Sequence, residues 1–289
     1  MRAIIYLCQI IGALLLWTVC GEGSAAPAQQ AQFNTHFVAI AFHDIVDAGQ
    51  PADFDGVSAD KLVAFMDWLK ADGWTPVSAA DVTEAAMGHR SLPPKAIVLG
   101  FDDGYVSFYN RVYPLLLAYR YPAVLSLVGE WMSQAPGTMV DYGGRPVPRE
   151  HFLTWDQVRR MQASGLVEVA SHTFDLHRTV LINRQGNSVG APRAWVFDPK
   201  RNAIETDQQH RARIYADLVK SRDLIARETG IVPHVLVWPY GRFSGPGVEV
   251  ARSLGFDQIY SLTPDEADAR NPLQIPRYYP TRDPDLGVT

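Results

Sequence analysis

The chain has 289 residues, of which 47% are hydrophobic and 20% charged, and its formal net charge is −5. This composition is typical of a folded globular protein, and the length suits one domain of the size of an α/β barrel. An acidic chain offers no positive field to a polyanion, so nucleic acid is excluded as an expected partner.

The first residues are typical of a secretory signal. One arginine precedes an uncharged apolar stretch, and a segment of small residues follows in which Ala26 and Ala28 fit a signal-peptidase site. We therefore expect residues 1–28 to be a signal peptide and residues 29–289 to form a periplasmic or secreted domain. Cys20 offers an alternative, a lipid tether to the outer membrane, which its bulky neighbours disfavour. Since both cysteines of the chain lie in this segment, we expect the mature domain to have no disulfide.

Short apolar runs alternate with amphipathic stretches from Phe37 onward. The runs with the length and composition of buried strands are residues 37–42, 95–101, 123–129, 166–171 and 234–240. Weaker strand candidates begin at residues 74, 256 and 273. The helices between them carry end signals, such as the capping box of Thr206 with Gln209 and the closing Gly230. This alternation predicts a parallel sheet, and about seven or eight strands favour a closed barrel over the alternative, an open doubly wound sheet.

Two stretches interrupt this pattern with glycine, proline, arginine and asparagine. They cover residues 140–151 and 179–207. The second is too long for a simple connection in a compact domain, and loops of that length usually bind ligands or act as lids. We therefore expect residues 179–207 to be an irregular loop with a binding or lid role.

Reactive side chains stand where four of the predicted strands end. They are, in chain order, His43, Asp102, Asp103, His172, Trp238 and Tyr240. In a parallel barrel the C-terminal ends of the strands gather at one rim, and that rim carries active sites. Side chains that are roughly 200 residues apart in the sequence are therefore expected to meet in space.

His172 and His177 are five residues apart in the segment SHTFDLH. An extended strand would hold them roughly 16 Å apart and a helix would turn them away from each other, so they can share an ion where the chain folds back. Two histidines at this spacing are by themselves more often unconnected surface residues. A carboxylate from another strand end would complete a set of two His and one Asp, which leaves positions open for water and substrate.

Taken together, these motifs resemble the polysaccharide deacetylase family. The segments FHDI, FDDG, SHTFDLH and WPYG are similar to the family's motifs and follow one another in the family's order, and the similarity extends over residues 37–279. The resemblance implies a distorted (β/α)7-8 barrel and hydrolysis of N-acetyl groups. The spacing of the two histidines agrees with the branch that acts on exported poly-β-1,6-N-acetylglucosamine of biofilms.

The resemblance leaves alternatives open for the function. One is deacetylation of peptidoglycan or a chitin-like polymer, and another is a glycan-binding export module that keeps the fold without catalysis. The implied partners are an N-acetylglucosamine polymer and an outer-membrane export porin. The implied metal ligands are Asp103, His172 and His177, a set that suits a divalent Zn, Fe, Co or Ni ion.

The resemblance also implies the catalytic roles. Asp102 is the expected general base, His43 the expected general acid, and the backbone N–H of Tyr105 the expected donor to the oxyanion. The alternative for His43 is a buried histidine that is hydrogen-bonded to the backbone. Trp238 and Tyr240 are either aromatic residues of the core or candidates for substrate contact, because a sugar-binding rim uses flat apolar faces.

One position departs from the family's pattern. Many members have an arginine two residues before the proline of the WPYG-like motif, where it contacts the catalytic aspartate, and here that position is Val237. We expect Arg277 to orient Asp102 in its place, and we also count Arg277 among the candidates for substrate binding.

Overall fold

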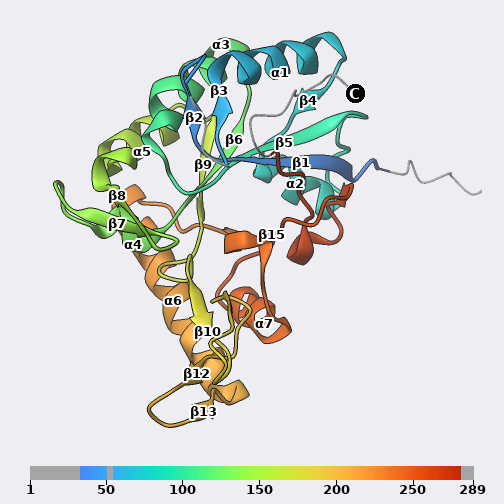
Figure 1. The fold of residues 1–289 in the computed structure, drawn as a ribbon. Coiled ribbons are helices and arrows are strands. Elements are labelled where there is room, and N and C mark those ends of the chain that lie inside the picture. The colour runs from blue at the N-terminus through green and yellow to red at the C-terminus, as the bar shows by residue number, and fades with distance from the viewer. Residues whose placement is uncertain (1–32, 51–54, 281–289) are drawn as a thin grey trace, which may run out of the picture. The chain divides into compact units, whose positions relative to one another are not determined.

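A mostly parallel, curled sheet forms the centre of the computed structural model, which describes residues 33–50 and 55–280 (Figure 1). Along the sheet its strands are β15 (Gln258–Tyr260), β14 (Val235–Val237), β9 (Val167–Ser171), β6 (Ala123–Leu127), β5 (Ala96–Phe101), β1 (His36–Phe42) and β16 (Ala267–Asp268), with β4 (Thr75–Pro76) also paired to β5. All these pairs are parallel except the pairing of β16 with β1. The strands predicted from the apolar runs are thus confirmed.

Residues 275–278 close the gap between the two edges of this sheet. Tyr278 exchanges hydrogen bonds of 2.8 and 2.9 Å with Ala39 and Ala41 of β1. Ile275 forms two bonds of 2.8 Å to the backbone of β15 and the residue after it. A half-barrel that an irregular segment completes confirms the predicted distorted (β/α)7-8 barrel, and the open doubly wound sheet is not formed.

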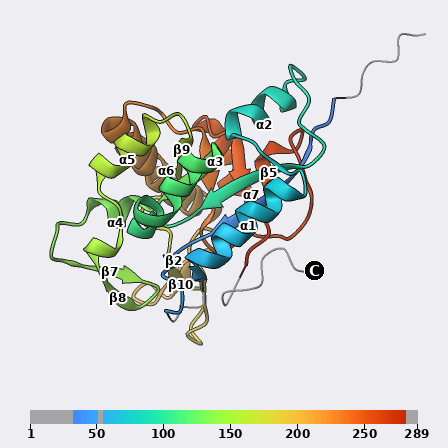
Figure 2. The same ribbon diagram turned by 90° about the horizontal axis from the view of Figure 1, so that it is seen from above.

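Helices surround the curled sheet (Figures 1 and 2), most of them on its outer face, whereas the buried residues of α2 pack with the residues inside the curl. They are α1 (Ala59–Ala71), α2 (Ala79–Ala86), α3 (Tyr113–Tyr119), α4 (Gly129–Ser133), α5 (Trp155–Gln162), α6 (Asp207–Thr229) and α7 (Gly245–Ser253). The capping box of Thr206 with Gln209 is present at α6, and Gly230 ends that helix at a φ of 76°. Among the described residues, no helix combines the length and hydropathy needed to cross a bilayer.

Alternate residues of each strand pack on opposite sides of the sheet. In β5, Leu99 and Phe101 join the cluster that packs against α1, α3 and α5, whereas Val98 joins a second cluster with Ala39 and Val235 inside the curl. Because strand side chains alternate between two faces, the residue parity decides which side chains can reach the interior of the barrel.

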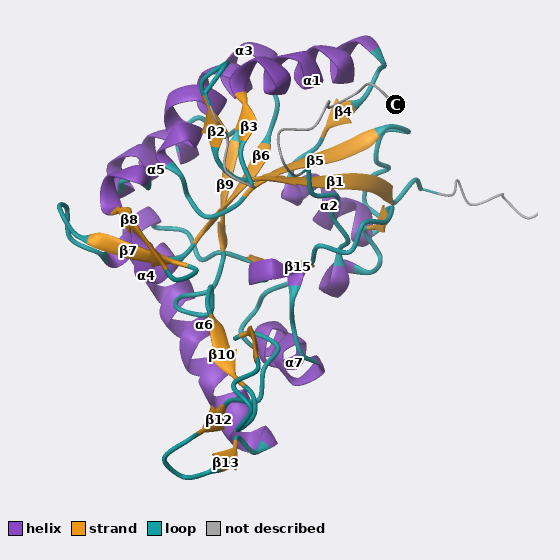
Figure 3. Cartoon of the chain, in the orientation of Figure 1, coloured by secondary structure: helices purple, strands orange, loops and turns teal. Residues whose placement is uncertain are grey.

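The two interrupted stretches contain hairpins, which corrects the expectation of irregular loops. The first carries the hairpin of β7 (Met139–Tyr142) and β8 (Arg145–Pro148). Outside these two stretches, β2 (Ile45–Val46) forms a short parallel pair with β3 (Val57–Ser58). The second carries β10 (Thr179–Leu181) with β11 (Ser188–Gly190), then β12 (Phe197–Asp198) with β13 (Ala203–Ile204). These last hairpins lie beside α6 and α7 (Figure 3). These strands are only two to four residues long, which is too short for an alternating pattern to be recognised in the sequence.

The predicted signal peptide, residues 1–28 with Cys20, lies outside the described residues. Cleavage and lipid attachment therefore stay predictions from the sequence.

Candidate active site

Three buried side chains converge at the rim where the parallel strands end. Asp103 Oδ1 lies 3.4 Å from His172 Nε2 and 3.3 Å from His177 Nε2. Ligands bound to a tetrahedral ion at about 2.0–2.1 Å are roughly 3.4 Å apart, so this donor set fits a divalent metal. Asp103 Oδ1 has no hydrogen-bond partner among the described residues, as expected for an oxygen that serves as a metal ligand.

The FDDG turn directs the two neighbouring aspartates to different sides, so that Asp102 contacts Arg277 and Asp103 faces the two histidines. Asp103 has a φ of 73° and Gly104 a φ of 76°, so the chain reverses immediately after the strand. An added Cβ at Gly104 would lie 2.7 Å from Leu127 Cδ2, so the leucine would have to shift, and the positive φ also favours glycine at that position. The Asp-Gly pair is therefore a turn and also the support of the site.

Both histidines are held in the neutral form that binds metals. Burial lowers the pKa of His172 to about 3 and that of His177 to about 4. The Nδ1–H of His172 donates to the Val237 carbonyl at 2.8 Å, so Nε2 keeps its lone pair toward Asp103. Burial raises the pKa of Asp103 to about 7, and a bound cation would favour its ionised form.

The fold-back that brings the histidines together is held from α6. Asp217 accepts hydrogen bonds from the backbone N–H of Phe174 at 2.8 Å and of Asp175 at 2.7 Å. Thr173 takes a positive φ of 69° in the same turn. We did not predict this role for Asp217, although an acidic residue on the buried stripe of α6, between Ile214 and Ser221, is a signal that the sequence carries.

Asp102 points into the barrel and pairs with Arg277. Two guanidinium nitrogens of Arg277 donate to the two carboxylate oxygens at 3.0 and 2.9 Å, and the Ser126 hydroxyl adds a bond of 2.8 Å. Burial by itself would raise the pKa of Asp102, but the charge and hydrogen bonds of Arg277, aided by the nearby histidines, hold it well below its usual range. The carboxylate is therefore ionised at neutral pH.

Arg277 is in the position that we expected for the residue that orients Asp102. Its side chain is 2% exposed and its Nε–H is bonded to the Ser261 carbonyl at 3.0 Å. No part of this buried guanidinium is left to contact a polymer, so the assignment of Arg277 to substrate binding is wrong.

His43 lies beside Asp102 at the edge of the site. Its Nε2 is 4.0 Å from Asp102 Oδ2, and its ring is 5.0 Å from the ring of Tyr279. The Tyr279 hydroxyl is bonded to Asp55, and the Tyr142 hydroxyl donates to Asp103 Oδ2 at 2.9 Å. Tyr279, Asp55 and Tyr142 were not predicted as site residues, since none of them belongs to one of the four motifs.

The aromatic candidates have different surroundings. The Tyr240 ring lies 4.6 Å from the ring of His177 and is partly exposed, so it can contact a bound sugar. Trp238 is fully buried among apolar residues of β14, α6 and α7, and its predicted contact with substrate is therefore wrong. The Tyr105 ring stacks on Phe152 at 5.3 Å, and the oxyanion role of the Tyr105 N–H stays a prediction.

The curled barrel carries a cluster of aspartates and histidines at its rim, which is an arrangement typical of hydrolases. The family model described as "Polysaccharide deacetylase" matches residues 89–259, and the chain belongs to this family.

Curated and solved relatives agree with this assignment. The chain is 39% identical over 261 residues to poly-β-1,6-N-acetyl-D-glucosamine N-deacetylase of Escherichia coli K12, covering 90% of this chain and 38% of the relative. The chain thus spans less than half the length of that relative. Among solved structures, a de-N-acetylase from Aggregatibacter actinomycetemcomitans has a TM-score of 0.80 at 34% identity, covering 84% of this chain and 94% of that chain. The BpsB deacetylase domain from Bordetella bronchiseptica has a TM-score of 0.77 at 36% identity, covering 84% and 95%.

Proposed function

We propose that the protein is an exported, metal-dependent N-deacetylase that acts on poly-β-1,6-N-acetylglucosamine and releases acetate. The observation that carries this proposal is the geometry at the rim. An ionised Asp102 lies 4.0 Å from His43, and its sequence neighbour Asp103 faces two neutral histidines. The substrate is supported by the name of the Escherichia coli relative, which matches over 90% of this chain.

The residues present fit the reaction in which water cleaves an acetamide. When bound by Asp103, His172 and His177, a divalent metal supplies a Lewis acid that polarises a carbonyl and lowers the pKa of water toward neutrality. Asp102 accepts the proton of the attacking water, and Arg277 keeps the carboxylate ionised and fixed in direction.

The leaving amine also needs a proton as the C–N bond breaks. His43 is the donor in this proposal, because its Nε2 lies 4.0 Å from Asp102 Oδ2 and a histidine next to the reacting groups can act as a general acid. The backbone N–H of Tyr105 stabilises the oxyanion, and the partly exposed ring of Tyr240 packs against the sugar.

Acetate release from acetylated β-1,6-glucosamine oligomers tests the function. We expect release that a chelator abolishes and that returning Zn, Fe, Co or Ni restores, each ion assayed separately. Asp102→Asn removes the proton acceptor and should lower kcat roughly 100- to 10,000-fold. Asp60→Asn, an exposed change on α1, is the matched control.

Three results would contradict parts of this proposal. Release that is unchanged in Asp102→Asn removes the assigned base. Faster release from chitin or peptidoglycan fragments than from β-1,6 oligomers changes the substrate. Affinity for the polymer without acetate release with any of the metals favours a glycan-binding export module.

The location and the further partner are part of the same proposal. The signal-like segment 1–28 supports a periplasmic or secreted protein, with an outer-membrane export porin as the route of the polymer. Fractionation of cells that express the full chain and the Cys20→Ser variant tests export and lipid tethering separately. A cytoplasmic, uncleaved product contradicts the export.

A further inference from the structure

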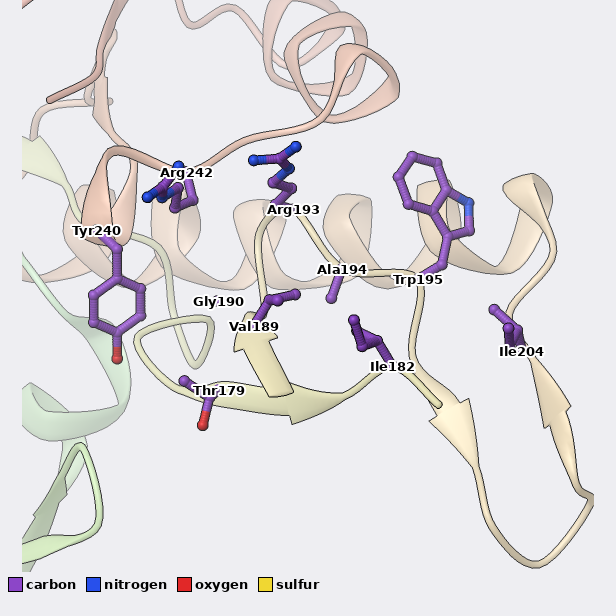
Figure 4. A pocket seen from close by; sticks show the side chains of 10 residues that line it. All are labelled: Thr179, Ile182, Val189, Gly190, Arg193, Ala194, Trp195, Ile204, Tyr240 and Arg242. Atoms are coloured by element: carbon purple, nitrogen blue, oxygen red, sulfur yellow. The ribbon is translucent and has the colours of Figure 1, made fainter. Parts of the chain in front are cut away.

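A cavity of about 730 Å³ lies between the hairpin β10–β11 and the segment after β14 (Figure 4). Its walls include Ile182, Val189, Arg193, Trp195, Tyr240 and Arg242. Ligand pockets usually measure about 300–1,000 Å³ and are mostly apolar with a few polar groups, as this one is. In Figure 4, Tyr240 and Trp195 occupy opposite ends of the lining, with the two arginines between them.

Tyr240 connects this cavity to the candidate active site. One side of its ring faces His177, with the ring centroids 4.6 Å apart. On the cavity side, an added Cβ at Gly190 would lie 3.0 Å from Tyr240 Cδ2. The ring is thus held between a proposed metal ligand and the hairpin, and a polymer bound at the rim can extend past Tyr240 into the cavity.

The opposite end of the cavity is rigid. The Trp195 indole stacks on buried His210 with ring centroids 4.4 Å apart, and its Nε1–H donates to Asp207 at 2.9 Å. His210 is in turn hydrogen-bonded to the Ala194 carbonyl at 2.9 Å and to the Ser244 hydroxyl at 2.7 Å. A fixed indole that is partly exposed suits contact with the apolar face of a sugar ring.

Two arginine side chains bring positive charge to the cavity. Arg193 and Arg242 are exposed, and within the described residues neither guanidinium forms an ion pair or hydrogen bond. By contrast, nearby Arg213 is paired with Glu205 at 2.8 Å. The lining contains no acidic residue. Free guanidinium groups donate hydrogen bonds to carbonyl oxygens and repel ammonium groups.

We propose that this cavity binds the polymer unit next to the one being deacetylated and that it selects an N-acetylated unit. The inference rests on the proposed function and adds a specificity to it. An acetamide is neutral and offers a carbonyl oxygen to Arg193 and Arg242, whereas a deacetylated unit brings an ammonium group into their field. A deacetylated unit therefore slows deacetylation of its neighbour on one side, so that free amines on adjacent units become less frequent in the product.

Synthetic β-1,6 pentamers test this selection. One is fully acetylated, and two carry a single glucosamine directly before or directly after the central unit. We expect kcat/KM at the central unit to fall about fivefold or more for one of the two, since a pair of like charges in water has an effect of about that size. Raising the salt concentration should reduce this ratio.

Variants identify the arginines as the cause. In the double variant Arg193→Gln, Arg242→Gln, the ratio of kcat/KM for the fully acetylated pentamer to kcat/KM for the glucosamine-containing pentamer should be close to one. Lys200→Gln removes a positive charge from the same stretch, residues 179–207, at a position that does not line the cavity. This variant should keep the ratio of the wild type. A wild-type ratio near one on both sides, or a ratio that the double variant retains, overturns the inference.

Binding of the same pentamers, measured by calorimetry without turnover, separates the two proposals. If the wild type binds the acetylated pentamer more tightly and the double variant loses this preference, the role of the cavity is supported. If the enzyme also releases no acetate in the activity assay, the deacetylase function fails while the role of the cavity stands. Equal affinities for all three pentamers overturn the cavity's role even where the enzyme is active.

Discussion

Asp217 tests whether the turn between the two histidines is supported from α6. Its carboxylate accepts two backbone N–H groups, from Phe174 and Asp175, at 2.8 and 2.7 Å. Asp217→Asn keeps one acceptor oxygen but places an NH2 group against the other N–H. One hydrogen bond to a charged group contributes about 1.5–3 kcal/mol, so we expect a loss of folding free energy of that order.

The same substitution should weaken metal binding, because the turn sets the distance between His172 and His177. Loss of a group that orients metal ligands typically lowers metal affinity about 10- to 100-fold. The assay is a competitive chelator titration of the purified protein, with denaturant unfolding in parallel. Asp223→Asn, an exposed position on the same helix, is the matched control. Metal affinity within a factor of two of the wild type would refute the reasoning.

Three further predictions concern the barrel. Arg277→Gln leaves the buried carboxylate that it binds without a counter-charge and should lower the free energy of unfolding by about 3–5 kcal/mol, with partial recovery in Arg277→Lys; an unchanged denaturant midpoint contradicts this. Hydrogen bonds to Asp257 and Glu168 raise the pKa of His234 to about 10. Its stabilisation is therefore fully present below the unfolded pKa of about 6.5 and is lost as the pH rises through the folded value, so melting curves of His234→Gln should approach the wild type at high pH and differ most near pH 6. Gly104→Ala adds a Cβ 2.7 Å from a side chain at a positive φ and should reduce both stability and metal affinity, measured by unfolding and chelator titration.

The sequence predicted the strand ends well because the barrel itself arranges them. Asp102, Asp103 and His172 follow buried strands, and parallel strands bring their C-terminal ends to one rim. Their convergence needed no knowledge of the helices or loops. The same holds for Arg277, which lies in the segment 275–278 that closes the barrel.

The error at Trp238 has a physical reason that parity could have revealed. In β14, Val235 and Val237 face the interior of the barrel, so Leu236 and Trp238 face the outer layer with α6 and α7. A position at the end of a strand is therefore not sufficient to predict a site residue. As long as the strand conformation continues, the side chain must also have the parity of the interior, whereas Asp103 reaches the site because the chain turns there at a positive φ.

The remaining site residues depend on tertiary packing. Tyr142 reaches Asp103 from the hairpin β7–β8, and Asp55 meets Tyr279 although 224 residues separate them. Hairpins of this kind bring no local pattern that specifies where they pack. Asp217 is the exception, since its place on the buried stripe of α6 could have been noticed.

The segment 275–278 completes the barrel and also delivers the guanidinium that neutralises Asp102. During synthesis this segment leaves the ribosome after all the strands of the sheet. Asp102 therefore has no Arg277 counter-charge until the barrel is closed. Proteolysis before Ile275 would remove both the backbone that closes the barrel and the counter-charge of Asp102. The Asp102–Arg277 pair therefore forms only in a completed barrel, and a chain cut before Ile275 would lack the partner that orients the proposed base.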